Sequence, residues 1–331
     1  MKNGMSYVVL PEEKTRKVSF YLAMEEYVAR ALGGGDYLFY WQVEPSVVFG
    51  RNQLIANEVN VDYCRSHGIA MFRRKSGGGC VYADKDNVMF SFVTDGDNVN
   101  LTFNRYMNMM VLMLRKMGVD AVATGRNDIM VDGRKVSGNA FYHLPGRSIV
   151  HGTMLFDTDM EHMVRSITPP GDKLQSNGVD SVRRRVALLK DYVDIGIDGF
   201  KQSVRQTLCD GEVVLTADDV RRIEDIERSV YLSEDFIYGS EPRHTVVRRR
   251  RIDGVGGVEA HIDVKGRIIR NVTLSGDFFA TGDVDGSLLW RLKNVELTPE
   301  AVAAVLPARL DDVIMNLRKE DFVSLLTDDN E

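Results

Sequence analysis

Cysteines and long apolar runs are scarce in this chain of 331 residues. Its three cysteines, Cys64, Cys80 and Cys209, are widely spaced and odd in number, so they predict neither a disulfide framework nor a metal site. No apolar run approaches the ~18 to 20 residues that a membrane span needs. Residues 1–17 lack the apolar core of a signal peptide. These absences predict a cytoplasmic protein that does not enter a membrane.

An excess of positive charge is also absent. Lysine and arginine number 42 against 48 aspartates and glutamates, which gives a net charge of −6 and makes general nucleic-acid binding an unlikely function class. The length suffices for one large domain and a smaller one. Composition changes after the arginine-rich run at residues 243–251. We therefore expect a catalytic domain at 1–245 and a small α+β accessory domain at 246–331.

Hydrophobic periodicity predicts two long helices and a pair of early strands. Residues 19–32 and 102–117 repeat apolar side chains with the 3.6-residue period of a helix, and each run ends at glycine. The second helix is rich in methionine, which we interpret as core packing rather than as a binding groove. Apolar runs at 37–42 and 46–50, separated by Glu44-Pro45, predict a hairpin.

A three-stranded antiparallel meander is predicted next, at residues 127–131, 135–142 and 148–156. Asp132-Gly133 is a typical hairpin turn between the first two strands. Lys135 follows this turn, and strand alternation places its side chain on the face opposite Val136. A surface position is the default for a single lysine. A lysine inside such a strand, beside a glycine, is nevertheless a candidate for chemistry.

The most distinctive stretch is RRKSGGGCVY at residues 73–82. Three cations and a hydroxyl precede three glycines, whose backbone can approach a ligand closely and present N–H groups to an anion. The stretch joins a strand to a strand. A phosphate-binding P-loop and a dinucleotide fingerprint each open a helix and have other glycine spacings, so we exclude both. The pattern predicts an anion site.

A second basic segment, between Pro169 and Leu189, contains the run Arg183, Arg184 and Arg185. Such a long loop without its own secondary structure is usually functional or disordered. Two basic loops and Lys135 suit the activation of a carboxylate by ATP. A lysine that reaches both the carboxylate and the α-phosphate would stabilise the charge of the transition state.

Four motifs, in order, carry a resemblance to a known family. They are RRKSGGGCVY, GRNDIMVDGRKVSGNAFY, HGTMLFD and KLQSNGVDSVRRRV, with VVFGRNQ upstream and GVEAHIDVKGRIIRNVTLSGDFF downstream. Together they resemble lipoate–protein ligase A over nearly the whole chain. The resemblance implies an α+β fold shared with biotin ligases, with a mixed, largely antiparallel sheet flanked by helices.

The resemblance also implies a reaction and its partners. Lipoate and ATP, with Mg²⁺, would give lipoyl-AMP, and the lipoyl group would pass to a lysine of a lipoyl domain of a 2-oxo acid dehydrogenase E2 subunit or of the glycine-cleavage H protein. Lys135 would be catalytic. The implied ATP-binding residues are Arg74, Gly79, Cys80, Val81, Tyr82, Asp128, Lys135, Ser181, Arg183 and Arg185. The implied lipoate-binding residues are Arg73, Ser76, Gly77, Gly78, Lys135, Gly138, His151 and Gly152. The ligands of Mg²⁺ stay unassigned, with Asp128 a candidate.

The chain departs from the family pattern at Cys80, Ala83, Asn177, Arg184 and Leu188. Two alternatives follow from the residues. A cysteine-dependent octanoyl or lipoyl transferase of the same fold would need a nucleophilic thiol, and Cys80 lies beside cations that favour thiolate. The other alternative is a non-catalytic protein that binds nucleotide or lipoate, which would have no need of Lys135.

Overall fold

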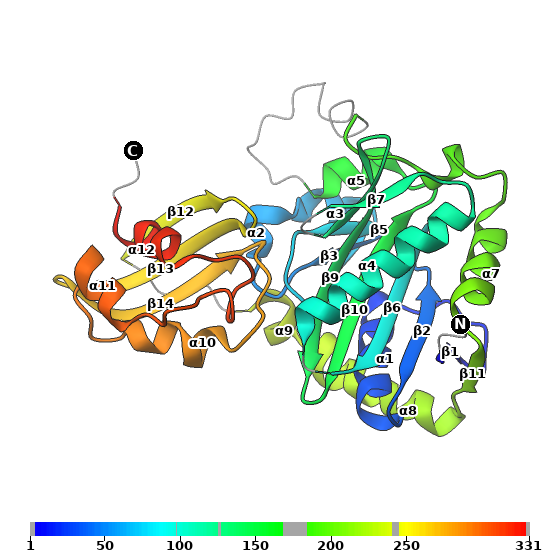
Figure 1. Ribbon diagram of the computed structural model, residues 1–331, viewed down its shortest axis with the longest axis horizontal. Coiled ribbons are helices and arrows are strands. Elements are labelled where there is room, and N and C mark those ends of the chain that lie inside the picture. Colours follow the sequence, from blue (N-terminus) through cyan, green and yellow to red (C-terminus); the bar gives the residue numbers. More distant parts are fainter. Residues whose placement is uncertain (1–3, 97, 125–126, 168–183, 240–244, 329–331) are drawn as a thin grey trace.

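The computed structural model describes residues 4–96, 98–124, 127–167, 184–239 and 245–328 (Figure 1). Among these residues, none of the helices combines the length and the apolar character that crossing a membrane requires.

An eight-stranded sheet forms the centre of the larger part. Its parallel portion joins β1 to β2 and β11, and all its other pairs are antiparallel. The strands β8, β9 and β10 are consecutive antiparallel neighbours, which confirms the predicted meander. In spatial order the strands are β11 (Gly211–Val214), β1 (Met5–Val9), β2 (Asp36–Trp41), β6 (Asn87–Asp95), β10 (Arg147–Leu155), β9 (Arg134–Leu144), β8 (Asp128–Val131) and β7 (Ala121–Ala123).

Helices cover both faces of this sheet. The methionine-rich α4 (Val99–Lys116) and α7 (Ile197–Leu208) pack on one face, and α1 (Val18–Ala31) and α8 (Ala217–Ile226) pack on the other. Figure 1 shows α4 crossing the sheet. Met110 of α4 is fully buried in the core, so its helix packs as predicted from its period. Burying each such side chain contributes about 1.5–3 kcal/mol.

A separate three-stranded sheet carries the glycine stretch. Its order is β4-β3-β5, from Ala70–Arg73, Ser46–Phe49 and Val81–Ala83. The predicted hairpin between residues 37–42 and 46–50 is wrong, because β2 pairs with β1 and β6 while β3 pairs with β4 and β5. Both runs are almost continuously apolar, and such runs carry no alternation that assigns a strand to one partner.

The C-terminal part has its own sheet and its own core. β12 (Val246–Ile252), β13 (Gly256–Lys265) and β14 (Ile268–Gly276) form an antiparallel sheet over a separate apolar cluster. The fold class predicted for both parts is confirmed. The boundary at 245/246 remains a prediction, because residues 240–244 lie outside the described residues.

The other elements connect or cover these sheets. They are α2 (Ile55–Glu58), α3 (Val61–Ser66), α5 (Met160–Ser166), η1 (Leu189–Asp191), η2 (Glu227–Tyr231), α9 (Glu234–Tyr238), α10 (Val284–Ser287), η3 (Leu289–Leu292), α11 (Pro299–Val305) and α12 (Lys319–Thr327).

Candidate active site

A pocket lies between the small sheet and strands β9 and β10 of the large sheet. It holds about 560 Å³ of space, including the part open to solvent. Its wall combines apolar side chains with part of the glycine stretch and with Lys135. Its lining residues are Leu22, Trp41, Val48, Arg74, Gly78, Gly79, Cys80, Val81, Met89, Asn127, Lys135, Gly138, Asn139, Ala140, His151, Gly152 and Thr153.

Most of the predicted site residues converge on this pocket, and several do not line it. Ser181 and Arg183, with Asn177 of the departures, lie outside the described residues. The predicted residues that line the pocket are Arg74, Gly78, Gly79, Cys80, Val81, Lys135, Gly138, His151 and Gly152. Those that are described but are absent from its wall are Arg73, Ser76, Gly77, Tyr82, Asp128 and Arg185. Their binding roles remain predictions.

Arg74 organises the glycine stretch from within. Its guanidinium is buried and donates to the carbonyls of Val48 (2.8 Å), Gly77 (2.8 Å) and Gly79 (2.7 Å), and to the Ser76 hydroxyl (2.9 Å). Burial lowers the pKa of Arg74 to about 10. The loop carbonyls therefore turn toward this cation. Four of the five N–H donors of a guanidinium are engaged in these bonds, so little of Arg74 is left for a ligand.

Arg73 has a similar structural position one residue earlier. Its Nη1 donates to the carbonyls of Gly50 (3.1 Å), Arg51 (2.8 Å) and Gln53 (2.8 Å). Its Nε donates to the carbonyl of Ile237 at 2.9 Å. Arg73 thus joins the start of the glycine stretch to two neighbouring segments, and it lies away from the pocket wall.

Two of the three glycines face the C-terminal part of the chain. A Cβ on Gly77 would collide with the backbone carbonyl of Phe278, and a Cβ on Gly78 would lie 2.9 Å from the ring of Phe279. The Gly78 N–H also donates to the Phe278 carbonyl, at 3.3 Å. Phe279 in turn stacks on Phe141 of β9, with ring centroids 5.5 Å apart. Glycine is needed here because another segment of the protein packs closely against the loop.

The third glycine, Gly79, has no atom within 4 Å of an added Cβ, and it lines the pocket together with Cys80. Within the described residues, no protein acceptor is recorded for the backbone N–H groups of Gly79 and Cys80. With the carbonyl of Gly79 held by Arg74, these N–H groups are available to an anion. Tyr82 is buried in a different apolar cluster, and Ala83 is fully buried, so the departure at 83 lies in the protein interior.

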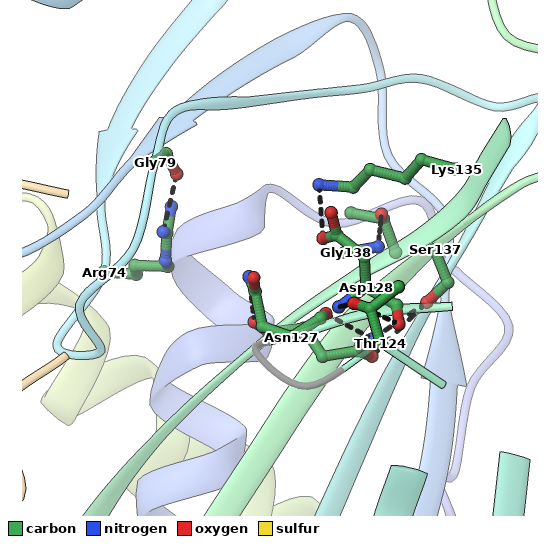
Figure 2. A network of polar contacts seen from close by, with 10 residues as sticks. Arg74, Gly79, Thr124, Asn127, Asp128, Lys135, Ser137 and Gly138 are labelled. Carbon is green, nitrogen blue, oxygen red and sulfur yellow. Dashed lines mark hydrogen bonds and ion pairs between the residues drawn. The ribbon is translucent and has the colours of Figure 1, made fainter. Parts of the chain in front are cut away.

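Lys135 and Asp128 form an ion pair at the edge of the pocket, with 2.8 Å between Nζ and Oδ1 (Figure 2). A Cβ on Gly138 would lie 2.8 Å from the same Nζ, so glycine leaves room for the lysine. The register of β8 and β9 shifts between Ile129 and Met130. This bulge interrupts the predicted alternation and lets Lys135 reach Gly138, three residues away.

The end of the second basic loop is attached to the same strand. The Lys135 N–H donates to the Arg185 carbonyl at 2.8 Å, and the Ala187 N–H donates to the Lys135 carbonyl at 2.7 Å. These bonds form a short parallel bridge between Lys135 and Val186. The backbone around Arg185 is therefore fixed beside the lysine.

A buried polar chain that the sequence did not reveal lies behind the pocket wall. His151 contacts the Ser76 hydroxyl through Nε2 (2.7 Å) and the Glu25 carboxylate through Nδ1 (2.9 and 3.0 Å). A serine, a histidine and a glutamate thus meet although no spacing predicted it. The one available signal was Glu25 itself, an acidic residue within the apolar run of α1. Gly152 is required because Asn139 fills the space where its Cβ would be.

Comparison with known proteins identifies the family. The family "Lipoyl protein ligase A/B catalytic domain" matches residues 17–209, which is more than half of the chain, and "Bacterial lipoate protein ligase C-terminus" matches residues 241–326. The chain belongs to the lipoate–protein ligase family. The predicted resemblance is confirmed.

Relatives of this ligase match over most of their length. Lipoate-protein ligase LplJ of Bacillus subtilis is 34% identical, covering 92% of this chain and 95% of the relative. Lipoate–protein ligase 1 of Staphylococcus aureus is also 34% identical, with 85% and 89% covered. Among solved structures, a lipoate-protein ligase A bound with ATP is 26% identical with a TM-score of 0.60, covering 72% of this chain and 99% of that one. The bi-partite ligase of Thermoplasma acidophilum has 28% identity and a TM-score of 0.65, covering 73% and 100%.

Proposed function

We propose that this ligase activates the carboxylate of lipoate with ATP and transfers the lipoyl group to a lysine of an acceptor protein. The observation that carries this proposal is the position of Lys135. This residue lines one pocket together with Gly79 and Cys80, which offer backbone N–H groups, and with the apolar side chains of Leu22 and Trp41. A nucleotide phosphate fits the N–H groups, and an acyl chain fits the apolar side chains.

In the first step, a carboxylate oxygen of lipoate attacks the α-phosphorus of ATP. The bond from the α-phosphorus to the bridging oxygen breaks, and pyrophosphate leaves with that electron pair. The Lys135 ammonium stabilises the charge on the attacking and phosphoryl oxygens. The N–H groups of Gly79 and Cys80 bind phosphate oxygens without carrying net charge.

In the second step, the neutral ε-amine of the acceptor lysine attacks the lipoyl carbonyl. AMP leaves with the electron pair of the acyl–oxygen bond, and the amine loses its proton as the amide forms. The apolar side chains of the pocket keep the acyl chain in place between the two steps, and Gly152 and the ring of His151 form part of the pocket wall.

Magnesium fits this site as a companion of ATP rather than as a resident ion. Within the described residues, no cluster of three or more His, Cys, Asp or Glu side chains has the arrangement of a metal site. Mg²⁺ usually takes one or two protein carboxylates together with substrate phosphates, and Asp128 would supply such a carboxylate beside the pocket. The ion would neutralise charge on the pyrophosphate group.

Acceptor and compartment are further parts of the proposal. The Thermoplasma acidophilum structure is described as a ligase and its E2 lipoyl domain, which supports lipoyl domains as acceptors, and the glycine-cleavage H protein is a second candidate acceptor. Free Cys64, Cys80 and Cys209 support a reducing compartment, the cytoplasm. We also propose that residues 1–245 form a catalytic domain and residues 246–331 an accessory domain, because the C-terminal part has a sheet and an apolar core of its own.

The cysteine-dependent transferase is the weaker alternative. Cys80 is the cysteine on the pocket wall, and burial raises the pKa of its thiol far above the ordinary range, despite an opposing effect of Arg74. A nucleophilic thiol needs the opposite shift. A purely binding protein would have no need of a lysine in this pocket.

Lipoate-dependent exchange of radioactive pyrophosphate into ATP tests the proposal. We expect exchange by the pure protein when lipoate, ATP and Mg²⁺ are all present, and no exchange without lipoate. Transfer of a lipoyl group from an acyl-carrier donor, with no exchange, would instead assign the protein to the transferases.

A further inference from the structure

A continuous chain of buried hydrogen bonds connects helix α1 to the glycine stretch. The Trp41 indole donates to the Ser91 hydroxyl at 2.9 Å, and Ser91 donates to Glu25 at 2.6 Å. Glu25 contacts His151, which contacts Ser76, the acceptor of the Arg74 Nε–H. Glu25 and Ser91 are fully buried, and Ser76 is 1% exposed. The chain is therefore buried, and Trp41, His151 and Arg74 are its members that also line the pocket.

Elementary valence fixes the direction of these bonds. A carboxylate only accepts, so His151 Nδ1 carries a proton toward Glu25. The Ser76 oxygen accepts from Arg74, which leaves its single hydrogen free to donate to Nε2 of His151. The uncharged Nδ1–H form of His151 then satisfies every group in the chain. Both ring nitrogens are occupied, so His151 is not available as a base for the substrate.

Glu25 and Arg74, on either side of His151 and Ser76 in this chain, carry opposite charges. An isolated buried charge is costly, and a buried pair is stable only when hydrogen bonds satisfy both partners. The Glu25 carboxylate has Ser91 and His151, and the Arg74 guanidinium has Ser76 and three backbone carbonyls. Ser76 and His151 connect the two charges.

We propose that Glu25 and His151 are positioning residues for the nucleotide site. They act through Ser76 on Arg74, which holds the carbonyl of Gly79 and so leaves the N–H of Cys80, on the opposite side of the same planar peptide group, turned toward the phosphates. This inference rests on the proposed placement of ATP at the glycine stretch. It assigns a role to Glu25, a residue outside the predicted site.

The same side chains have the composition of a hydrolytic triad, and their burial argues against that function. Ser76 is absent from the pocket wall, and its oxygen already accepts from Arg74. A substrate carbonyl has no path to it. The serine is therefore a connector and not a nucleophile.

Glu25→Gln is the most informative variant. Its amide oxygen takes the place of Oε1 and still accepts from Ser91, and its NH2 group takes the place of Oε2, 2.9 Å from Nδ1 of His151, where it favours a ring proton on Nε2. Ser76 then receives two donors and its own hydrogen loses its acceptor. Ser76→Ala breaks the chain at a second point and leaves the Arg74 Nε–H without a partner. Glu26→Gln is the matched control, because Glu26 is the next residue of α1, is 5% exposed and pairs with Lys75 and Arg30 outside the chain.

Steady-state pyrophosphate exchange then separates positioning from stability. For Glu25→Gln and Ser76→Ala we expect the KM for ATP to rise about tenfold, the size expected for loss of one hydrogen bond to a charged group. The KM for lipoate should change less than threefold, and Glu26→Gln should match the wild type in both constants.

Nitrogen-15 NMR of the His151 ring supplies a readout that is independent of activity. The wild type should show a protonated Nδ1 and an unprotonated Nε2, and Glu25→Gln should reverse them. A wild-type ring with unprotonated Nδ1 overturns the inference, as does an unchanged KM for ATP in Glu25→Gln and Ser76→Ala. An active wild type with unaffected variants refutes only the positioning role. A wild type without lipoate-dependent exchange refutes the proposed function, and the ring protonation still tests the chain.

Discussion

At the scale of single residues, the residue types in the sequence did not reveal which groups their side chains contact. The three consecutive cations at residues 73–75 suggested a counter-charge for a ligand, but in the structure all three side chains bond to other groups of the protein. Arg73 and Arg74 donate to backbone carbonyls, and Lys75 forms an ion pair with Glu26 at 2.5 Å. Among the described residues of this stretch, the backbone N–H groups of Gly79 and Cys80 are the anion donors that we propose.

Lys135 is the residue whose loss should matter most. We expect Lys135→Ala to reduce lipoate-dependent pyrophosphate exchange about 10²- to 10³-fold, because electrostatic stabilisation of a transition state by one preorganised group has about this size. The side chain is about one-third exposed, so the melting temperature should stay near that of the wild type. Lys190→Ala, which removes another partly exposed lysine paired with an aspartate, is the matched control. Near-normal exchange in Lys135→Ala would show that the assigned role is wrong.

The Cys80 thiol should have low nucleophilic reactivity. Since burial raises the pKa of its thiol, the neutral form persists above the ordinary thiol range and the reactive thiolate forms only at higher pH. We therefore expect slow alkylation by iodoacetamide at pH 8, and Cys80→Ala should keep most of the exchange activity. Rapid alkylation that follows a titration near neutrality, with loss of activity in Cys80→Ala, would favour the cysteine-dependent transferase.

At the scale of elements, the glycine stretch is a strand connection whose shape depends on a neighbour far away in sequence. Gly78 has φ = +86° and packs on Phe279. Gly118 has nearly the same backbone, φ = +84°, with nothing within 4 Å of an added Cβ. Both positions therefore favour glycine because of their positive φ, but only at Gly78 would an added Cβ also meet a neighbouring side chain.

This pair of glycines allows a controlled experiment. Gly118→Ala should lower the free energy of unfolding by about 1–3 kcal/mol through backbone strain alone. Gly78→Ala should cost that amount and an additional ~1–3 kcal/mol from overpacking against Phe279. Urea denaturation monitored by circular dichroism measures both. Equal losses in the two variants would contradict a tight contact at Gly78.

The early strands illustrate why pairing partners were not predictable. Residues 37–42 and 46–50 were each recognised as strand, but they belong to different sheets. Periodicity reports which side of a strand is buried, and these strands are buried on both sides. The meander at β8, β9 and β10 was predictable because short glycine turns restrict each strand to its sequence neighbour.

At the scale of the whole molecule, Phe279 joins the two parts of the chain. It is 2% exposed and belongs to the large core beside Phe141, although it follows β14 in the C-terminal part of the chain. The Gly276 N–H also donates to the Asn52 carbonyl at 2.9 Å. We therefore expect the two parts to unfold in one calorimetric transition.

Phe279→Ala should uncouple them. Removal of this ring should cost about 3–5 kcal/mol and separate the single transition into two in differential scanning calorimetry. Phe322→Ala is the control, because Phe322 is fully buried within the core of the C-terminal part alone. Phe322→Ala should destabilise the C-terminal part without comparably weakening its contacts with the larger part. A single unsplit transition in Phe279→Ala would show that other contacts suffice to join the parts.

The sequence by itself determined the family, the fold class, the meander and the convergence of Arg74, Gly79, Lys135 and His151 on one pocket, because ordered motifs and local turn chemistry carry that information. Only the tertiary structure decided which other parts of the protein these residues contact. Glu25 and Phe279 lie far from the glycine stretch in sequence, yet they shape it through a buried hydrogen-bond chain and a packed ring. Hydrogen bonding and close packing act between residues that only folding brings together. The strand-to-strand loop at residues 73–82 could therefore be recognised from the sequence, but the hydrogen-bond chain and the aromatic ring that hold it in place could not.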